Sequence, residues 1–367
     1  MPNIYDSGPS TALVDWGTTG EKTLLVITDN LSSGKKAVIF TVGWDAASDV
    51  PALGTLRIKK GANVLPDEGI TRVFNAGGMR AKAVMIFAYD SAAAGNDSYS
   101  LVANVSTAAT GTSTLHVQGM SILLDDVAFY NAAANNSITA GSTADLVSVS
   151  PTYPAGVKLI ILAYVMAAVA STTANPRLFD AGNIRITDGS SILSSNQFQL
   201  GTEKNDEPAL VPLIAVVDNM PPNPTYKIQI MNNLSETVQA WGQMLVFTVP
   251  ELMFLDTGAV ALANGSQTTV GDLTTYIAGD EIGVIGLLSA ENTGAADATI
   301  AAGNVVLQRN NATADQKASQ RGWYLYASSQ SGRCGTLPLM RVDANIANPT
   351  YQMKATAPAA GLNGEAK

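Results

Sequence analysis

A long internal repeat limits what this chain can fold into more than any other feature of the sequence. Asn223-Pro-Thr-Tyr226 returns as Asn348-Pro-Thr-Tyr351 at an offset of 125, and Tyr153–Val165 returns as Tyr276–Leu288 at an offset of 123. The first third joins more faintly, through Asn96-Asp-Ser-Tyr99. A unit of about 120 residues is too long for a solenoid repeat of roughly 20 to 50 residues. It has the size of a whole domain, so the repeat favours a protein that builds or binds over one that catalyses.

The local pattern within each copy predicts strands. Short runs rich in β-branched residues alternate with Gly, Pro, Asn, Asp and Ser, and no capped amphipathic helix of three turns is found. We expect about eight strands per copy and, because the Cys pair and central Trp of an immunoglobulin-like sandwich are missing, a jelly roll. The predicted fold is therefore all-β, with three tandem jelly-roll-like β-sandwich domains. In the middle copy the expected strands are 136–139, 144–149, 157–165, 183–187, 191–198, 209–217, 225–231 and 239–247.

The repeat also predicts the domain boundaries. Residues 1–125 form the first and most divergent copy, 126–251 the second and 252–367 the third. The junctions are short and lack Gly/Ser-rich linkers, which predicts a stiff rod of stacked domains. The third copy reaches Lys367 where the counterpart of Ala240–Phe247 would begin, so we expect it to lack its last strand. Either the natural chain continues, which we favour, or a neighbour supplies that strand.

Composition excludes several classes of function. Charged residues make up only 14% of the chain and the net charge is −9, which is unsuited to nucleic acid. Arg57, Lys59 and Lys60 alternate on a strand and are expected on a solvated face. No secretory signal is visible at the N-terminus, and the apolar run from Leu159 to Ala170 is too short to span a bilayer.

The sequence contains few of the residues that catalysis or metal binding would need. His116 is the single histidine and Cys334 the single cysteine, so an intrachain disulfide is impossible and zinc or transition-metal sites are close to excluded. His116 lies in an alternating strand without a Gly-x-Ser-x-Gly elbow elsewhere in the chain. We therefore expect no enzyme activity, no catalytic residues, no metal site and no cofactor.

Aromatic residues are the remaining candidates for a binding site. Trp44 and Trp241 adjoin apolar strands and are expected in the core. Trp323-Tyr-Leu-Tyr326 alternates aromatic side chains. If this segment forms an edge strand, Trp323, Tyr324 and Tyr326 could stack on a sugar ring or a receptor.

In overall layout the chain resembles the vertex turret, spike and penton-associated proteins of archaeal turreted icosahedral viruses. The resemblance covers the whole chain and rests on the three copies quoted above, the low charge and the lack of a catalytic set. It implies a structural virion protein at the surface of the capsid vertex, without a direct membrane span. Its partners would be further copies of itself, most plainly in a pentameric ring, other capsid or penton proteins, and a host receptor or glycan.

Two alternatives belong to other classes. One is an extracellular filament or adhesin subunit, in which the next subunit along the fibre supplies the missing strand. The other is an array of sugar-binding modules, which requires exposed tryptophans on an open sheet face and facing carboxylate pairs.

Overall fold

The protein is all-β in the computed structural model. The structure describes residues 4–45, 53–65, 71–74, 82–108, 112–125, 128–169, 178–201, 209–233, 237–274, 281–292, 304–310, 316–321, 333–344, 347–357 and 362–367. These residues form strands β1 to β26 and no helix. None of them therefore supplies an apolar helix long enough to cross a membrane.

The strands divide among the three copies of the repeat. The first copy contains β1 (Ile4–Asp6), β2 (Ser10–Asp15), β3 (Gly20–Thr28), β4 (Gly34–Asp45), β5 (Leu53–Lys60), β6 (Asn63–Val64), β7 (Thr71–Phe74), β8 (Lys82–Ala93), β9 (Ser98–Thr107) and β10 (Thr112–Leu124). The second contains β11 (Ala128–Ile138), β12 (Thr143–Val149), β13 (Lys158–Val169), β14 (Leu178–Thr187), β15 (Ile192–Gly201), β16 (Ala209–Val217), β17 (Tyr226–Asn232) and β18 (Val238–Val249). The third contains β19 (Val260–Ala261), β20 (Gln267–Thr274), β21 (Glu281–Asn292), β22 (Asn304–Arg309), β23 (Gln316–Arg321), β24 (Arg333–Ala344), β25 (Thr350–Thr356) and β26 (Leu362–Ala366).

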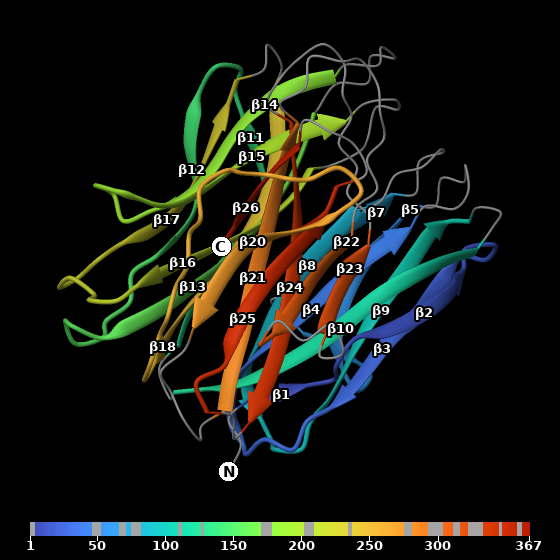
Figure 1. Cartoon of the computed structure of the whole chain (residues 1–367), viewed down its shortest axis with the longest axis horizontal. Helices are drawn as coiled ribbons and strands as arrows, with labels where there is room; N and C mark the ends of the chain where they lie inside the picture. The colour runs from blue at the N-terminus through green and yellow to red at the C-terminus, as the bar shows by residue number, and fades with distance from the viewer. Residues whose placement is uncertain are drawn as a thin grey trace. The chain divides into compact units, whose positions relative to one another are not determined.

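Strand order identifies each copy as a jelly roll. In the second copy the two sheets run β11-β18-β13-β16 and β12-β17-β14-β15, so the last strand lies between the first and the third. The third copy repeats this order as β19-β26-β21-β24 and β20-β25-β22-β23. The first copy keeps it as β1-β10-β4-β8 and β3-β9-β5-β6, with β2 also on β10 and β7 on β5 (Figure 1). Two four-stranded antiparallel sheets in this order are a jelly roll, so the predicted fold class is confirmed.

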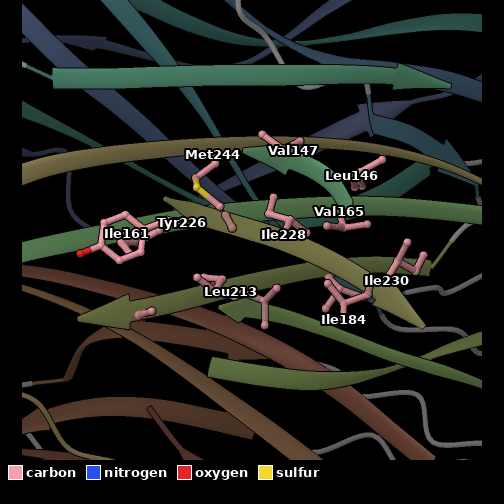
Figure 2. Close-up of a cluster of buried hydrophobic side chains, with 14 of the residues drawn as sticks. Leu146, Val147, Ile161, Val165, Ile184, Leu213, Tyr226, Ile228, Ile230 and Met244 are labelled. Atoms are coloured by element: carbon pink, nitrogen blue, oxygen red, sulfur yellow. The ribbon is translucent and has the colours of Figure 1, made fainter. Parts of the chain in front are cut away.

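The core of the second copy lies between its two sheets. Burial along β17 alternates strictly, with Tyr226, Ile228 and Ile230 facing inward, because successive side chains of a strand point to opposite faces. Figure 2 shows how side chains from both sheets meet there: Ile161 and Val165 of β13, Leu213 of β16, Met244 of β18, Ile184 of β14 and Leu146 and Val147 of β12.

The chain divides into two compact units that do not follow the order of the copies. Leu124–Leu252 form one unit, and Met1–Leu123 together with Met253–Lys367 form the other. In the latter, β24 of the third copy contacts β4 and β8 of the first. The expected rod, with copies stacked in chain order, is wrong in this respect, because the first and third jelly rolls pack on each other. The domain boundaries at 125 and 251 stay predictions.

The last strand of the third copy was expected to be absent, but it is present in shortened form. β26 spans Leu362–Ala366 and pairs with β21 from Leu288↔Ala366 to Asn292↔Leu362. One further pair continues the ladder, because Leu287 and Lys367 exchange both backbone hydrogen bonds, at 2.7 and 2.9 Å.

The repeated Asn-x-x-Tyr motif makes the same corner in all three copies. Its asparagine precedes β9, β17 and β25 and adopts a positive φ each time: 51° at Asn96, 51° at Asn223 and 46° at Asn348. Asparagine enters this left-handed region more readily than other residues with a Cβ atom. The repeat therefore preserves a backbone conformation as well as a residue type.

Asn96 offers a test of this corner. Asn96→Gly should change the free energy of unfolding little, because glycine adopts positive φ freely. Asn96→Val should cost about 1–2 kcal/mol, because a β-branched residue is disfavoured there. Urea unfolding followed by circular dichroism compares the two variants, and equal stabilities would contradict the assignment.

Candidate functional site

The predicted aromatic platform stays a prediction. Trp323, Tyr324 and Tyr326 lie outside the described residues. Of the other tryptophans, Trp16 is buried and Trp241 of β18 is half-buried. Neither of these two indoles forms an exposed platform for a sugar ring.

His116 lies within a regular sheet. It belongs to β10, is half-buried and pairs across the ladder with Thr11 of β2. Within the described ranges, no three His, Cys, Asp or Glu side chains are grouped in a way that could hold a metal ion.

The first jelly roll buries a charged network between two of its loops. Lys36 is fully buried, and its Nζ lies 2.9 Å from Oδ1 of Asp29 and 2.9 Å from Oδ2 of Asp97. Asp29 also accepts a hydrogen bond from Ser121 at 2.8 Å, and Asp97 accepts one from the backbone of Gly95 at 3.0 Å. One buried ammonium group thus joins the loop after β3 to the loop before β9.

Lys60 extends the network and corrects a prediction. Its Nζ lies 2.8 Å from Asp90 and 3.0 Å from Asp97, and its side chain is only 28% exposed. Lys59 is half-buried and pairs with Glu21 at 2.8 Å. The two lysines do not form a freely solvated face, because Glu21 of β3, Asp90 of β8 and Asp97 in the turn before β9 pair with them.

The pKa of Asp97 reports how well this network is satisfied. Burial alone would raise the pKa, but hydrogen bonds from Lys36 and Lys60 outweigh it and hold the value at about 2. A lowered carboxyl pKa stabilises the fold above the unfolded value near 4, and the contribution is lost as pH falls toward 2. The network is therefore intact at neutral and mildly acidic pH.

The third jelly roll contains a related cluster. Asp343 is buried, and its carboxylate accepts hydrogen bonds from Arg341, from Arg309 at 3.0 Å and from the hydroxyl of Tyr351 at 3.0 Å. Burial raises the pKa of Asp343, but the bond from Arg341 and the charges of both arginines outweigh it, so the pKa is lowered. Arg341 itself is fully buried and lies 5.8 Å from the centre of the Tyr351 ring.

The tyrosine of the repeated motif shows how the copies differ. Tyr99, Tyr226 and Tyr351 are all buried. The hydroxyl of Tyr99 donates to Asp90 at 2.7 Å, as that of Tyr351 does to Asp343. In the part of the chain that the structure describes, the hydroxyl of Tyr226 has no hydrogen-bond partner, and burial raises its pKa to about 12. The first and third copies thus share a charged corner that the second lacks.

These two copies also contact each other through carboxylates. Oδ2 of Asp6 in β1 accepts a hydrogen bond from the backbone of Val342 in β24 at 3.3 Å. Oε2 of Glu281 in β21 accepts one from the backbone of Ile4 at 3.2 Å. Both contacts join β1 to the third jelly roll and help hold the two copies in one compact unit.

An open pocket of about 650 Å³ lies at this contact. Its lining includes Asp6, Asn30, Glu281, Arg309 and Asp343. The three carboxylates of the lining accept hydrogen bonds within the protein: Asp6 from the backbone of Val342, Glu281 from the backbone of Ile4, and Asp343 from Arg309. The arrangement supports a junction between two domains, and it supplies no nucleophile paired with a general base.

Sequence reasoning missed both charged clusters. Their residues lie next to repeated positions: Asp97 follows Asn96 of the motif, and Asp343 lies eight residues before Tyr351. Buried aspartates close to repeated tyrosines were the available signal.

Lys36→Met tests the buried network. Removing the ammonium leaves Asp29 buried with its charge unpaired, so the free energy of unfolding should fall by about 3–5 kcal/mol. Lys59→Met is the matched control, because the pair with Glu21 is more exposed and should change stability by less than about 1 kcal/mol. If urea unfolding gives similar losses of free energy of unfolding for the two variants, the buried network contributes no more to stability than an exposed ion pair.

Tyr226→Phe and Tyr99→Phe separate the two kinds of corner. Removing the unpartnered hydroxyl of Tyr226 should be neutral or slightly stabilising, whereas Tyr99→Phe deprives Asp90 of a donor and should cost about 1–2 kcal/mol. Calorimetric Tm values of both variants provide the measurement. A loss at position 226 as large as that at position 99 would contradict this account.

Comparison with known proteins yields only distant likenesses. No family model matches the sequence, and no curated protein matches it. The chain is similar to a solved structure of an archaeal virus turret protein with a triple jelly-roll fold. Identity is 10%, coverage is 94% of this chain and 82% of that chain, and the TM-score is 0.23. The chain is also similar to the Sulfolobus turreted icosahedral virus structure, with 11% identity, coverage of 94% and 83%, and a TM-score of 0.23.

A third likeness is to a subviral particle of infectious bursal disease virus. Identity is 11%, coverage is 99% of this chain and 80% of that chain, and the TM-score is 0.25. TM-scores this low do not establish a common fold. The assignment of this chain as three jelly rolls rests on its own strand order.

Proposed function

We propose that this chain is a structural protein of a virus particle. The proposal rests on two features taken together. The chain contains three tandem jelly rolls, and the charged groups buried inside the first and third of them pair with each other and stabilise the fold. Jelly rolls occur mainly in viral capsids, lectins and cupins. A cupin-type metal centre needs several histidines, and this chain has one. A lectin role depends on Trp323, Tyr324 and Tyr326, which carry no geometric support.

The contact between the first and third copies suits a structural subunit. β1 is joined to β21 and β24 by hydrogen bonds to Glu281 and Asp6, so residues near both ends of the chain stabilise one unit. A structural subunit needs such a fixed arrangement, whereas a chain of independent binding modules does not.

In finer detail, we propose a turret or spike component at the capsid vertex. Copies of the chain assemble into a symmetric ring of five that projects from the capsid, contacts other capsid or penton proteins and attaches to a host receptor or glycan. Each subunit of a closed ring presents two different patches to its neighbours. The weakly charged surface, with 14% charged residues in the chain, favours packing between copies.

The oligomeric state tests this proposal. Light scattering after size exclusion, at several concentrations, should give a mass of five chains, and negative-stain imaging of that peak should show closed rings. A monomer at every concentration would contradict the ring. Open fibres would also contradict it and would favour the filament subunit.

A further inference from the structure

The buried network of the first jelly roll holds an amine against a carboxyl group. Nζ of Lys36 lies 2.9 Å from Oδ1 and 3.1 Å from Oδ2 of Asp29. Because these two oxygens flank Cγ of Asp29, the nitrogen also lies against that carbon, near the separation of about 3–3.5 Å from which positioned atoms react. The side chains of Lys36 and Asp29 are both 0% exposed. Both are therefore shielded from the bulk water that stabilises separated ions.

Hydrogen-bond donors hold the two oxygens of Asp29 in different ways. Oδ1 accepts hydrogen bonds from the backbone N–H of Leu31 at 3.3 Å and from that of Asp97 at 3.2 Å. Two backbone donors on one oxygen resemble an oxyanion hole, which stabilises the negative charge that develops there when a nucleophile attacks the carbon. Oδ2 accepts a hydrogen bond from the hydroxyl of Ser121 at 2.8 Å. Oδ1 is thus placed as a carbonyl oxygen, and Oδ2 as an oxygen that can leave.

Asp97 supplies a proton acceptor beside the same amine. Its Oδ2 lies 2.9 Å from Nζ of Lys36, and the backbone N–H of Gly95 donates to this oxygen at 3.0 Å. Burial raises the pKa of Asp97, but hydrogen bonds from Lys36 and Lys60 hold it at about 2, so the group is ionised at neutral pH. Nζ of Lys36 contacts one oxygen of Asp97 and both oxygens of Asp29. Cγ of Asp29 is therefore the better placed of the two carbons for attack.

We propose that Lys36 and Asp29 form an intramolecular amide bond, with Asp97 and Ser121 as catalytic residues. One proton moves from Nζ to Oδ2 of Asp29, which leaves a neutral amine beside a neutral carboxyl group. The nitrogen lone pair then forms a bond to Cγ, and the π electron pair of the carbonyl moves onto Oδ1. Asp97 takes a second proton from the now cationic nitrogen and returns it to Oδ2. The Cγ–Oδ2 bond breaks, the carbonyl re-forms at Oδ1, and Oδ2 leaves as water with both protons while Ser121 donates to it.

The reacting groups come from both sheets of the jelly roll. Asp29 follows β3 and Asp97 precedes β9, and these two strands belong to one sheet. Lys36 lies in β4 and Ser121 in β10, which belong to the other. The site therefore exists only in the folded domain, and the amide joins the two sheets covalently. The third jelly roll provides an internal comparison, because its buried cation, Arg341, does not give up its proton and cannot act as the nucleophile.

The mass of the chain tests this bond directly. The 367-residue chain, produced in folded form and then unfolded in urea, should be lighter than its calculated mass by one water. Tryptic digestion of the unfolded chain should give residues 23–35 joined to residues 36–57, because trypsin does not cleave after an acylated lysine. The full calculated mass, retained after prolonged incubation of the folded chain at neutral pH, would overturn the proposal.

Lys36→Arg is the matched control. Arginine keeps the positive charge beside Asp29 but cannot form the amide, because its guanidinium group stays protonated. This variant should have its full calculated mass. Asp188-Gly189 could also lose water, by closing to a succinimide, and Lys36→Arg retains that pair. An equal loss of water in Lys36→Arg and in the parent chain would therefore overturn the proposal.

Asp97→Asn tests the proton acceptor. An amide keeps the shape of the side chain but binds a proton far less readily, so the fraction of lighter chains at equal times after synthesis should fall at least about tenfold. Circular dichroism shows whether the variant folds, and an equal fraction in a folded variant would overturn the catalytic role of Asp97. If the variant does not fold, the mass of the parent chain still decides whether the bond forms. This readout is the mass of one unfolded chain, so it can fail separately from the particle mass that tests the proposed function.

Discussion

The insertion of the last strand between the first and the third is the interaction on which each sandwich depends. In the second copy β18 lies between β11 and β13, and its pairs with both run almost the full length of the strand. The sheet cannot close until the whole copy is available, which makes folding depend on contacts distant in sequence.

Buried charges distinguish the first and third copies from the second, although all three copies share one fold. Placing a lysine or arginine in a core is costly unless every polar atom finds a partner. Lys36 and Arg341 are fully buried and paired with aspartates, and a buried tyrosine lies beside each aspartate network. Among the described residues of the second copy, the corresponding corner has the buried tyrosine, Tyr226, without such a network. The copies with charged corners are the two that share one compact unit.

The fold was largely predictable because its signals are local. All eight strands expected in the middle copy are present, and residues 144–149 and 209–217 match β12 and β16 closely. Alternating apolar residues and turn-forming residues act within a few positions of each other. The burial of Lys60 was not predictable in this way. Alternation shows that it faces one side of a strand, but not that Asp90 and Asp97 cover that side.

The sequence by itself determined that this is an all-β protein built from three related copies, and strand order in the structure identified the copies as jelly rolls. Its 125-residue offset, its repeated asparagines and its single histidine and single cysteine are readable without coordinates. Only the tertiary structure decided that Lys36 joins Asp29 to Asp97 and that β1 packs on the third copy. Those outcomes depend on residues that are distant in the chain and close in space, and no local pattern encodes such meetings.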